Sequence, residues 1–220
     1  MLDWLRRRVS GAPARWRHHP GFPDDLWQST LATFPFLADS DPAAQIRLRA
    51  LTAAFLERKE FHGAGGLIIT DAMALAVAAQ ACLPLVHLAP SAPVGTTLRW
   101  YDDFVGIVLH PGEVLARRER TDDDGVVHHY REALTGEAMD GGPVMLSWAD
   151  VADAGRTAAQ GYNVVIHEFV HKIDMRNGAP DGCPPLPAGF MGASSVAQAR
   201  QTWHRLLEAA YNDFCDKLSL

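Results

Sequence analysis

Two histidines four residues apart in an apolar segment limit the possible structure and function of this chain more than any other feature of its sequence. They open and close the pentapeptide His167-Glu168-Phe169-Val170-His171, which apolar residues flank on both sides. On an α-helix, residues with this spacing lie about 40° apart around the axis and roughly 6 Å along it, so both imidazoles project from one face. The segment therefore predicts a buried helix that presents two histidine ligands to one metal ion.

Glu168 completes the chemistry that this pattern predicts. It lies about 100° around the helix from His167, where it can reach a metal-bound water without binding the metal itself. Zinc lowers the pKa of such a water toward about 7, Glu168 takes the proton as general base, and the hydroxide attacks a carbonyl that the metal polarises. Glu168 then returns the proton to the leaving amine. The H-E-x-x-H pattern thus predicts a zinc-dependent peptidase with one zinc ion.

The same helix leaves two alternatives open. The histidines could form a purely structural pair, although two imidazoles and a carboxylate would then be buried without a shared partner. Asp174 lies two turns after His167 on the same face, and it can bind the metal or accept a hydrogen bond from the N–H of a metal-binding histidine. The alternative for Asp174 is an ordinary carboxylate at a helix C-terminus, which the macrodipole disfavours. We favour the hydrogen-bond acceptor.

Length and composition indicate a folded enzyme. A chain of 220 residues with 48% hydrophobic residues can bury one sizeable core, and we expect a single domain over residues 21–220. The net charge of −6 argues against nucleic acid as a direct partner. Residues 1–20 are expected to form a solvated basic tail, because the apolar run of a signal peptide does not follow its arginines. These arginines are Arg6, Arg7, Arg8, Arg15 and Arg17.

The sequence predicts no membrane span and favours a reducing compartment. The stretch 72–88 lacks formal charge, but Gln80 and Pro84 interrupt it and alanine dominates, so it predicts a buried helix. The three cysteines are odd in number and widely spaced, which is typical of free thiols in cytoplasmic proteins. We therefore expect a cytoplasmic protein.

The first third of the chain predicts helices. Asp41 followed by Pro42 indicates the start of a helix that continues to Lys59, and Thr70 or Asp71 caps the next one. Near the C-terminus, apolar residues at helical spacing predict a last helix with Tyr211 in the core.

The middle of the chain predicts strands. Residues 104–109 form a short apolar run, and residues 114–120 pair with residues 126–134 as a hairpin. Residues 143–148 form a further strand before the motif helix. In peptidases of this design an extended substrate pairs with a strand beside the metal. Our candidates for this substrate strand are Val144, Met145, Leu146 and Ser147, and the alternative is an ordinary strand inside the sheet.

Longer blocks around the motif resemble one family. The similarity extends over most of the chain, from about Phe55 to about Leu218. It is carried by residues 57–61, 63–67, 79–82, 146–148, 163–169 and 171–175. These blocks resemble the Mlc titration factor A family of bacterial zinc peptidases.

The resemblance implies a fold and a partner. The fold is α+β, a zincin-like (gluzincin-type) metallopeptidase domain similar to the catalytic domain of anthrax lethal factor, with N-terminal helices, a small, mostly antiparallel sheet and the H-E-x-x-H helix. The activity is that of a cytoplasmic zinc-dependent aminopeptidase acting on peptides. The implied partner is a glucose-responsive transcriptional repressor, which members of the family draw away from its operators.

The resemblance further implies a third metal ligand, a Glu on a later helix, and a Tyr that assists the transition state. No segment here matches that part of the family. The one Glu after His171 is Glu208, in a stretch that matches a helix preceding the ligand segment. We therefore expect a C-terminally truncated chain whose third ligand lies beyond Leu220, with reduced zinc affinity or no bound metal in this chain.

Two functions follow as hypotheses. The first is a zinc peptidase, an aminopeptidase by resemblance. The alternative is a regulatory protein that sequesters a repressor with weak or no catalysis, the truncated chain being inactive. A structural metal site is a third reading, and it predicts no peptide turnover.

Overall fold

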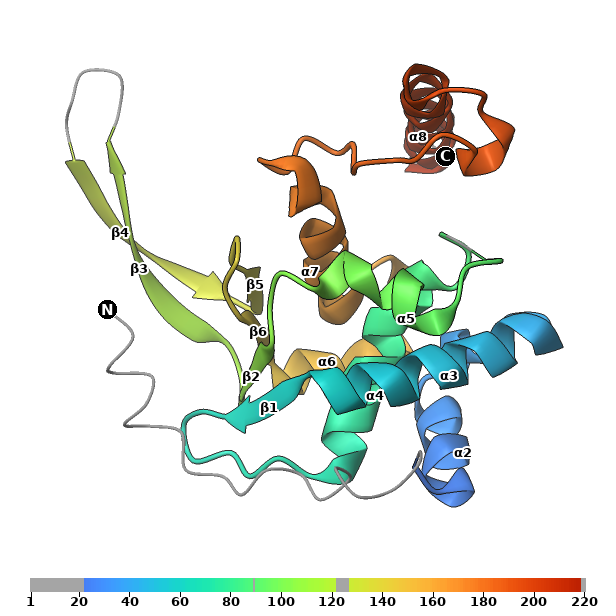
Figure 1. Cartoon of the computed structure of the whole chain (residues 1–220). Helices are drawn as coiled ribbons and strands as arrows, with labels where there is room; N and C mark the ends of the chain where they lie inside the picture. Colours follow the sequence, from blue (N-terminus) through green and yellow to red (C-terminus); the bar gives the residue numbers. More distant parts are fainter. Residues whose placement is uncertain (1–21, 89, 122–126, 219–220) are drawn as a thin grey trace. The chain divides into compact units, whose positions relative to one another are not determined.

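The computed structural model describes residues 22–88, 90–121 and 127–218 (Figure 1). The chain packs into two compact units that divide between Lys172 and Ile173. The expected basic tail over residues 1–20 lies outside the described residues. The expectation of a single domain over residues 21–220 stays a prediction.

The N-terminal helices of the first unit begin where the sequence places their caps. Asp41 accepts hydrogen bonds from the backbone N–H groups of Ala43 and Ala44 at 2.9 and 3.0 Å and so caps α3. Thr70, rather than Asp71, caps α4 by accepting from the Met73 N–H at 3.2 Å. These elements are α2 (Asp24–Thr33), η2 (Pro35–Leu37), α3 (Pro42–Arg58), α4 (Asp71–Cys82) and η3 (Leu83–Leu85).

Helix α4 is the centre of this unit. Every residue from Met73 to Cys82 is buried, as expected for a helix that is apolar on all sides. Within the described residues no helix is long and apolar enough to cross a membrane. The later helices of the unit are α5 (Val94–Thr97), η4 (Leu98–Tyr101), α6 (Trp148–Thr157), η5 (Ala158–Gln160) and α7 (Val164–Asp174), of which α7 carries the motif.

A four-stranded sheet packs with these helices in the order β1-β2-β6-β5 (Figure 1). Its strands are β1 (Glu60–Gly63), β2 (Gly106–His110), β6 (Val144–Ser147) and β5 (Gly136–Ala138). The pairs β1–β2 and β2–β6 are parallel, and only β5 pairs antiparallel with β6. The expectation of a mostly antiparallel sheet is therefore wrong. The connections explain the observed strand directions. Long crossovers separate β1 from β2 and β2 from β6, which allows parallel pairing, whereas a short turn joins β5 to β6 and makes that pair antiparallel.

The predicted hairpin is confirmed. Strand β3 (Val114–Thr121) pairs antiparallel with β4 (Val127–Leu134), from Val114 opposite Leu134 to Thr121 opposite Val127. The expected turn between the strands lies outside the described residues.

The second unit contains η6 (Met175–Asn177), η7 (Phe190–Gly192) and α8 (Val196–Leu218). Its small core consists of Leu186, Ala193 and Ala199, with Phe190 and Trp203 packed against it. The final helix is thus confirmed, but the placement of Tyr211 in the core is wrong, because its side chain is 67% exposed. Helical spacing identifies an apolar face without identifying a segment that covers it.

Candidate metal centre

The start of α7 is held by two side-chain amides, those of Asn163 and Gln80. The Asn163 side-chain oxygen accepts from the Ile166 N–H at 2.9 Å, which satisfies a free donor of the first helical turn. The Asn163 amide nitrogen donates to the side-chain oxygen of Gln80 at 2.8 Å. Gln80 is fully buried in α4, so this pair fixes the first turn of the motif helix to the central helix.

The middle of α7 is held by aromatic packing. Phe169 is fully buried, and its ring centroid lies 5.7, 5.2 and 5.8 Å from those of Phe55, Tyr101 and Phe104, respectively. Edge-on and tilted ring pairs at these distances are favourable in addition to the apolar area that they bury. The helix therefore cannot rotate about its axis without breaking this cluster.

Lys172 holds the last part of the helix within the first unit. Its side chain is fully buried, and its Nζ lies 2.7 Å from Asp103 Oδ2. The same Nζ donates to the carbonyl oxygens of Met139 and Gly142 at 2.7 and 3.2 Å. The helix is thus fixed at its start, middle and end by residues other than the two histidines.

The two motif histidines converge on one point. His167 Nε2 and His171 Nε2 lie 3.2 Å apart, with ring centroids 4.6 Å apart and ring planes at 88°. Two nitrogens bound tetrahedrally to one zinc at about 2.0–2.1 Å are separated by about 3.3–3.4 Å, so this pair fits two corners of a zinc site. The separation also suits an N–H···N hydrogen bond between the rings when no ion is present.

The helix is less buried than its composition predicts. His167 is exposed, His171 is half-buried, and Val170 is 45% exposed, whereas Glu168 is buried at 7% exposure. The expectation that both histidines and the carboxylate are buried together is therefore wrong for the histidines. An open face is compatible with a metal that must meet a substrate.

Glu168 lies against the edge strand of the sheet. Its carboxylate accepts a hydrogen bond from the Ala138 backbone N–H in β5. Burial raises the pKa of Glu168 most, His167 and the Ala138 N–H lower this pKa, and Glu137 raises it. A Cβ atom on Gly136 would lie 2.7 Å from Glu168 Cγ and Oε1, so the strand can approach this closely only with glycine there.

The predicted substrate strand needs correction. Val144, Met145 and Leu146 pair with β2 on one side and with β5 on the other, and the Ser147 N–H donates to the Thr135 carbonyl. Strand β6 therefore has no free edge to which a substrate could add. The strand at this edge of the sheet is β5.

The register shows which groups of β5 face outward. Across the β5–β6 pair, the Ser147 N–H donates to Thr135 O at 2.7 Å and the Met139 N–H donates to Pro143 O at 3.4 Å. Because this orientation alternates along an antiparallel strand, the backbone groups of Gly136 and Ala138 point away from β6. The outward Ala138 N–H is the one that reaches Glu168.

Asp174 is buried, with an exposed fraction of 7%. Its Oδ2 accepts from the Gly182 N–H at 2.8 Å, which ties the end of the helix to the following loop. Its Oδ1 is buried and has no hydrogen-bond partner among the described residues. A role for Asp174 as acceptor for a metal-binding histidine stays a prediction.

A complete three-residue metal site is not found in the part of the chain that the structure describes. No group of three or more His, Cys, Asp or Glu side chains there is arranged to hold a metal ion. The identity of the third ligand therefore stays a prediction.

Comparison with known proteins gives a match over almost the whole chain. Residues 2–219 match the family described as Glucose-regulated metallo-peptidase M90. The chain belongs to this family. The resemblance to Mlc titration factor A is also confirmed by individual relatives of the M90 chain. A protein from Klebsiella pneumoniae (strain 342) with this name is 32% identical over 195 residues, 88% of this chain and 66% of the relative. One from Salmonella arizonae is 33% identical over 197 residues, 90% of this chain and 71% of the relative.

Three features of this M90 chain were not predicted from its sequence. They are the edge strand β5 beside Glu168, the Asn163–Gln80 amide pair and the buried Lys172. The last two had a signal, because a glutamine and a lysine each interrupt a strongly apolar helix, and such residues are buried only with partners. Strand β5 is three residues long and had no usable periodicity.

Proposed function

We propose that this M90 chain is a zinc-dependent peptidase in which His167 and His171 bind the metal and Glu168 acts as general base. The observation that carries the proposal is the convergence of the two Nε2 atoms, 3.2 Å apart, beside a buried carboxylate. Zinc bound there supplies a Lewis acid that polarises a carbonyl and lowers the pKa of water. The proposal includes a third metal ligand that is not among the residues that the structure describes.

The chain's own contribution to the chemistry is orientation and proton transfer. The Ala138 N–H holds the Glu168 carboxylate at one end, so that its other oxygen can take a proton from water and return it to the leaving amine. The fixed helix keeps this carboxylate and the imidazoles in register, which reduces the entropy that must be lost in the transition state.

We place the substrate on β5 instead of β6. An extended peptide can pair with the outward groups that the Ala138 N–H contact with Glu168 leaves available, which are the Gly136 N–H and the carbonyl oxygens of Gly136 and Ala138. Backbone pairing recognises any peptide and leaves side-chain preference to neighbouring pockets. Cleavage from the amino terminus rests on the family resemblance alone, and a matched pair of free and N-acetylated amino-acid anilides tests it.

The decisive experiment compares Glu168→Gln with Glu57→Gln, which removes an exposed carboxylate outside the site. In zinc-loaded protein, Glu168→Gln should lower the release of product from amino-acid anilides by about 100-fold or more, because the general base is lost. Zinc content measured by elemental analysis should be unchanged in this variant and should fall in His167→Ala. Equal turnover by Glu168→Gln and Glu57→Gln would overturn the proposal.

A second function is favoured by the names of the relatives. Both are called Mlc titration factor A, which states that they titrate Mlc. We propose that this chain also binds a transcriptional repressor of that kind in the cytoplasm, where its three free cysteines stay reduced. Glu168→Gln should retain binding of purified repressor in a pull-down while losing hydrolysis. Absence of binding by the folded wild-type chain would contradict this second function.

A further inference from the structure

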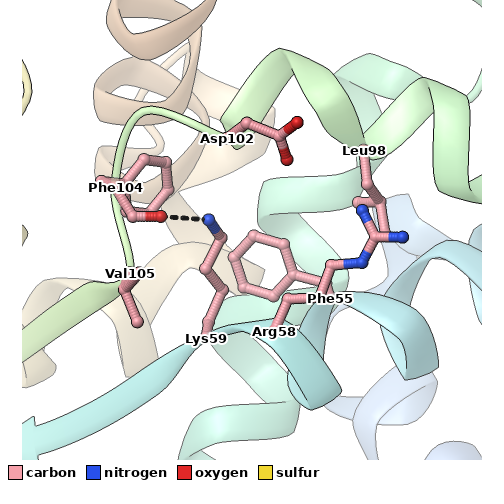
Figure 2. A pocket seen from close by; sticks show the side chains of 7 residues that line it. All are labelled: Phe55, Arg58, Lys59, Leu98, Asp102, Phe104 and Val105. Carbon is pink, nitrogen blue, oxygen red and sulfur yellow. Dashed lines mark hydrogen bonds between the residues drawn. The ribbon is translucent and has the colours of Figure 1, made fainter.

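A pocket of about 400 Å³ lies in the first unit, between the end of α3 and the segment that leads from η4 into β2 (Figure 2). Its walls combine apolar side chains with three charged ones. The lining residues are Phe55, Arg58, Lys59, Leu98, Asp102, Phe104 and Val105. None of them belongs to the proposed zinc site or to the β5 edge. The volume is in the usual range for small-molecule sites.

Lys59 is the unusual member of this lining. Its side chain is buried, with an exposed fraction of 8%. Its Nζ donates to the backbone carbonyls of Tyr101 and Phe104 and lies 3.8 Å from the centroid of the Phe104 ring. The amine therefore lies between two aromatic rings in Figure 2, with Phe55 on the other side.

The groups that contact this ammonium directly are two carbonyl dipoles and a ring face, and the carboxylates of Asp103 and Asp102 also act on it electrostatically. Carbonyl oxygens and a cation–π contact offset part of the cost of burying the charge. They do not offset all of it, because burial lowers the pKa of Lys59 from 10.5 to about 8 although the charges of Asp103 and Asp102 raise this pKa. An anion in the pocket would add negative charge beside the ammonium group and stabilise it further.

The other charged residues define which anion fits. Arg58 is exposed and donates to the Gly95 carbonyl at 3.3 Å, so most of its guanidinium donors stay available. Asp102 is exposed and stands on the opposite wall (Figure 2). Two cations and one carboxylate leave one net positive charge, which favours a monoanion over a phosphate dianion and over a cation.

We propose that this pocket binds a small monocarboxylate with an apolar body. The carboxylate lies toward Lys59 and Arg58, and the apolar body packs on Phe55, Leu98 and Val105. Arginine and lysine both form strong charge-assisted hydrogen bonds with a carboxylate. Two sources present this chemistry, a free aryl or alkyl carboxylic acid and the C-terminal carboxylate of a peptide.

The pocket is also connected to the motif helix. The rings of Phe55 and Phe104 form part of the pocket wall and pack directly against Phe169 in α7. An occupant therefore contacts the same rings that hold the metal helix in place. Binding of the carboxylate should raise the melting temperature of the chain even without zinc, because a ligand that binds only the folded state stabilises it.

The experiment uses metal-free full chain and titrates phenylacetate by calorimetry and NMR. We expect saturable binding with a Kd on the order of 1 mM, as is usual for a ligand of this size. Phenylacetamide, which lacks the charge, should bind about 10-fold more weakly. Benzyl phosphate tests the charge preference and should bind more weakly than phenylacetate, and N-acetylphenylalanine tests whether a peptide C-terminus is accepted in place of a free acid.

Two exposed lining residues supply the variants. Arg58→Gln should weaken phenylacetate binding about 10-fold, since it removes one charge-assisted partner. Val105→Trp should fill the pocket and abolish binding, and Val105 is 54% exposed, so the fold should tolerate the change. Arg156→Gln is the matched control, because Arg156 is exposed and lies outside the lining.

The proposal makes no use of the metal, so its failure can be told apart from failure of the zinc proposal. Absence of saturable binding of both phenylacetate and N-acetylphenylalanine to the folded wild-type chain would overturn it. Equal affinity for phenylacetate and phenylacetamide, or binding that persists in Val105→Trp, would overturn it as well. Tight binding of N-acetylphenylalanine but not phenylacetate would assign the pocket to peptide C-termini and contradict the free acid as its ligand.

Discussion

Helices α7 and α8 have similar apolar spacing but opposite burial. In α7, Val164, Val165 and Phe169 are at most 2% exposed. In α8, the exposed fractions of Leu207 and Phe214 are 45% and 56%. The spacing of apolar residues therefore identifies a face, and only the packing partners decide whether that face contributes to stability.

The largest expected difference between these helices is the cost of removing an aromatic ring. Phe169→Ala should lower the free energy of unfolding by about 4 kcal/mol, because it leaves a cavity among Phe55, Tyr101 and Phe104. Phe214→Ala in α8 should change it by less than about 0.5 kcal/mol, as for other exposed positions. Urea denaturation followed by circular dichroism measures both. Similar losses in the two variants would mean that the exposed face of α8 is covered in solution.

Ion pairs sharpen the same contrast. Lys172→Met breaks a pair whose lysine is fully buried, and it removes one donor from Asp103 and from each of two carbonyls. We expect a loss of about 3 kcal/mol, because the remaining charge is poorly solvated. Lys217→Met breaks the exposed pair with Asp213 at the same 2.7 Å distance and should cost about 0.3 kcal/mol. If the two urea midpoints shifted equally, burial would not be the property that separates the helices.

The difference between these helices also shows how far the sequence could predict this molecule. The relative placement of His167, Glu168 and His171 could be predicted from helical geometry, because spacing within one helix is a local property. Strand β5 and the parallel pairing of β1, β2 and β6 are non-local, and they depend on connections that no single segment encodes. The exposure of Tyr211 could not be predicted for the same reason, since burial depends on a partner elsewhere in the chain.

Helix caps give a smaller contrast. Asn163→Ala removes the oxygen that caps α7 and leaves the buried Gln80 amide without its partner, so it should cost about 1–2 kcal/mol. Ser195→Ala removes an exposed cap that accepts from the Gln198 N–H at 3.2 Å in α8 and should cost about 0.5 kcal/mol. The α7 variant should in addition weaken zinc binding, measured by competition with a chromophoric chelator. Unchanged zinc affinity in Asn163→Ala would show that the amide pair does not position the histidines.

The smallest expected effect is a dependence of stability on pH that arises at Lys59. Burial lowers its pKa to about 8 in the folded chain from 10.5, so above pH 8 the unfolded state binds more protons than the folded state. The cost of burying the charge is present in full below pH 8 and is relieved as the pH rises toward 10.5. The stability of the wild type relative to Lys59→Met should therefore increase by roughly 0.5–1 kcal/mol between pH 7 and pH 8.5. Lys217→Met controls for the loss of one positive charge at an exposed site. The free energy of unfolding of the wild type relative to Lys59→Met could instead stay constant or fall over this range. That result would mean that the groups around the ammonium stabilise it fully. The electrostatic argument for an anion in the pocket would then fail.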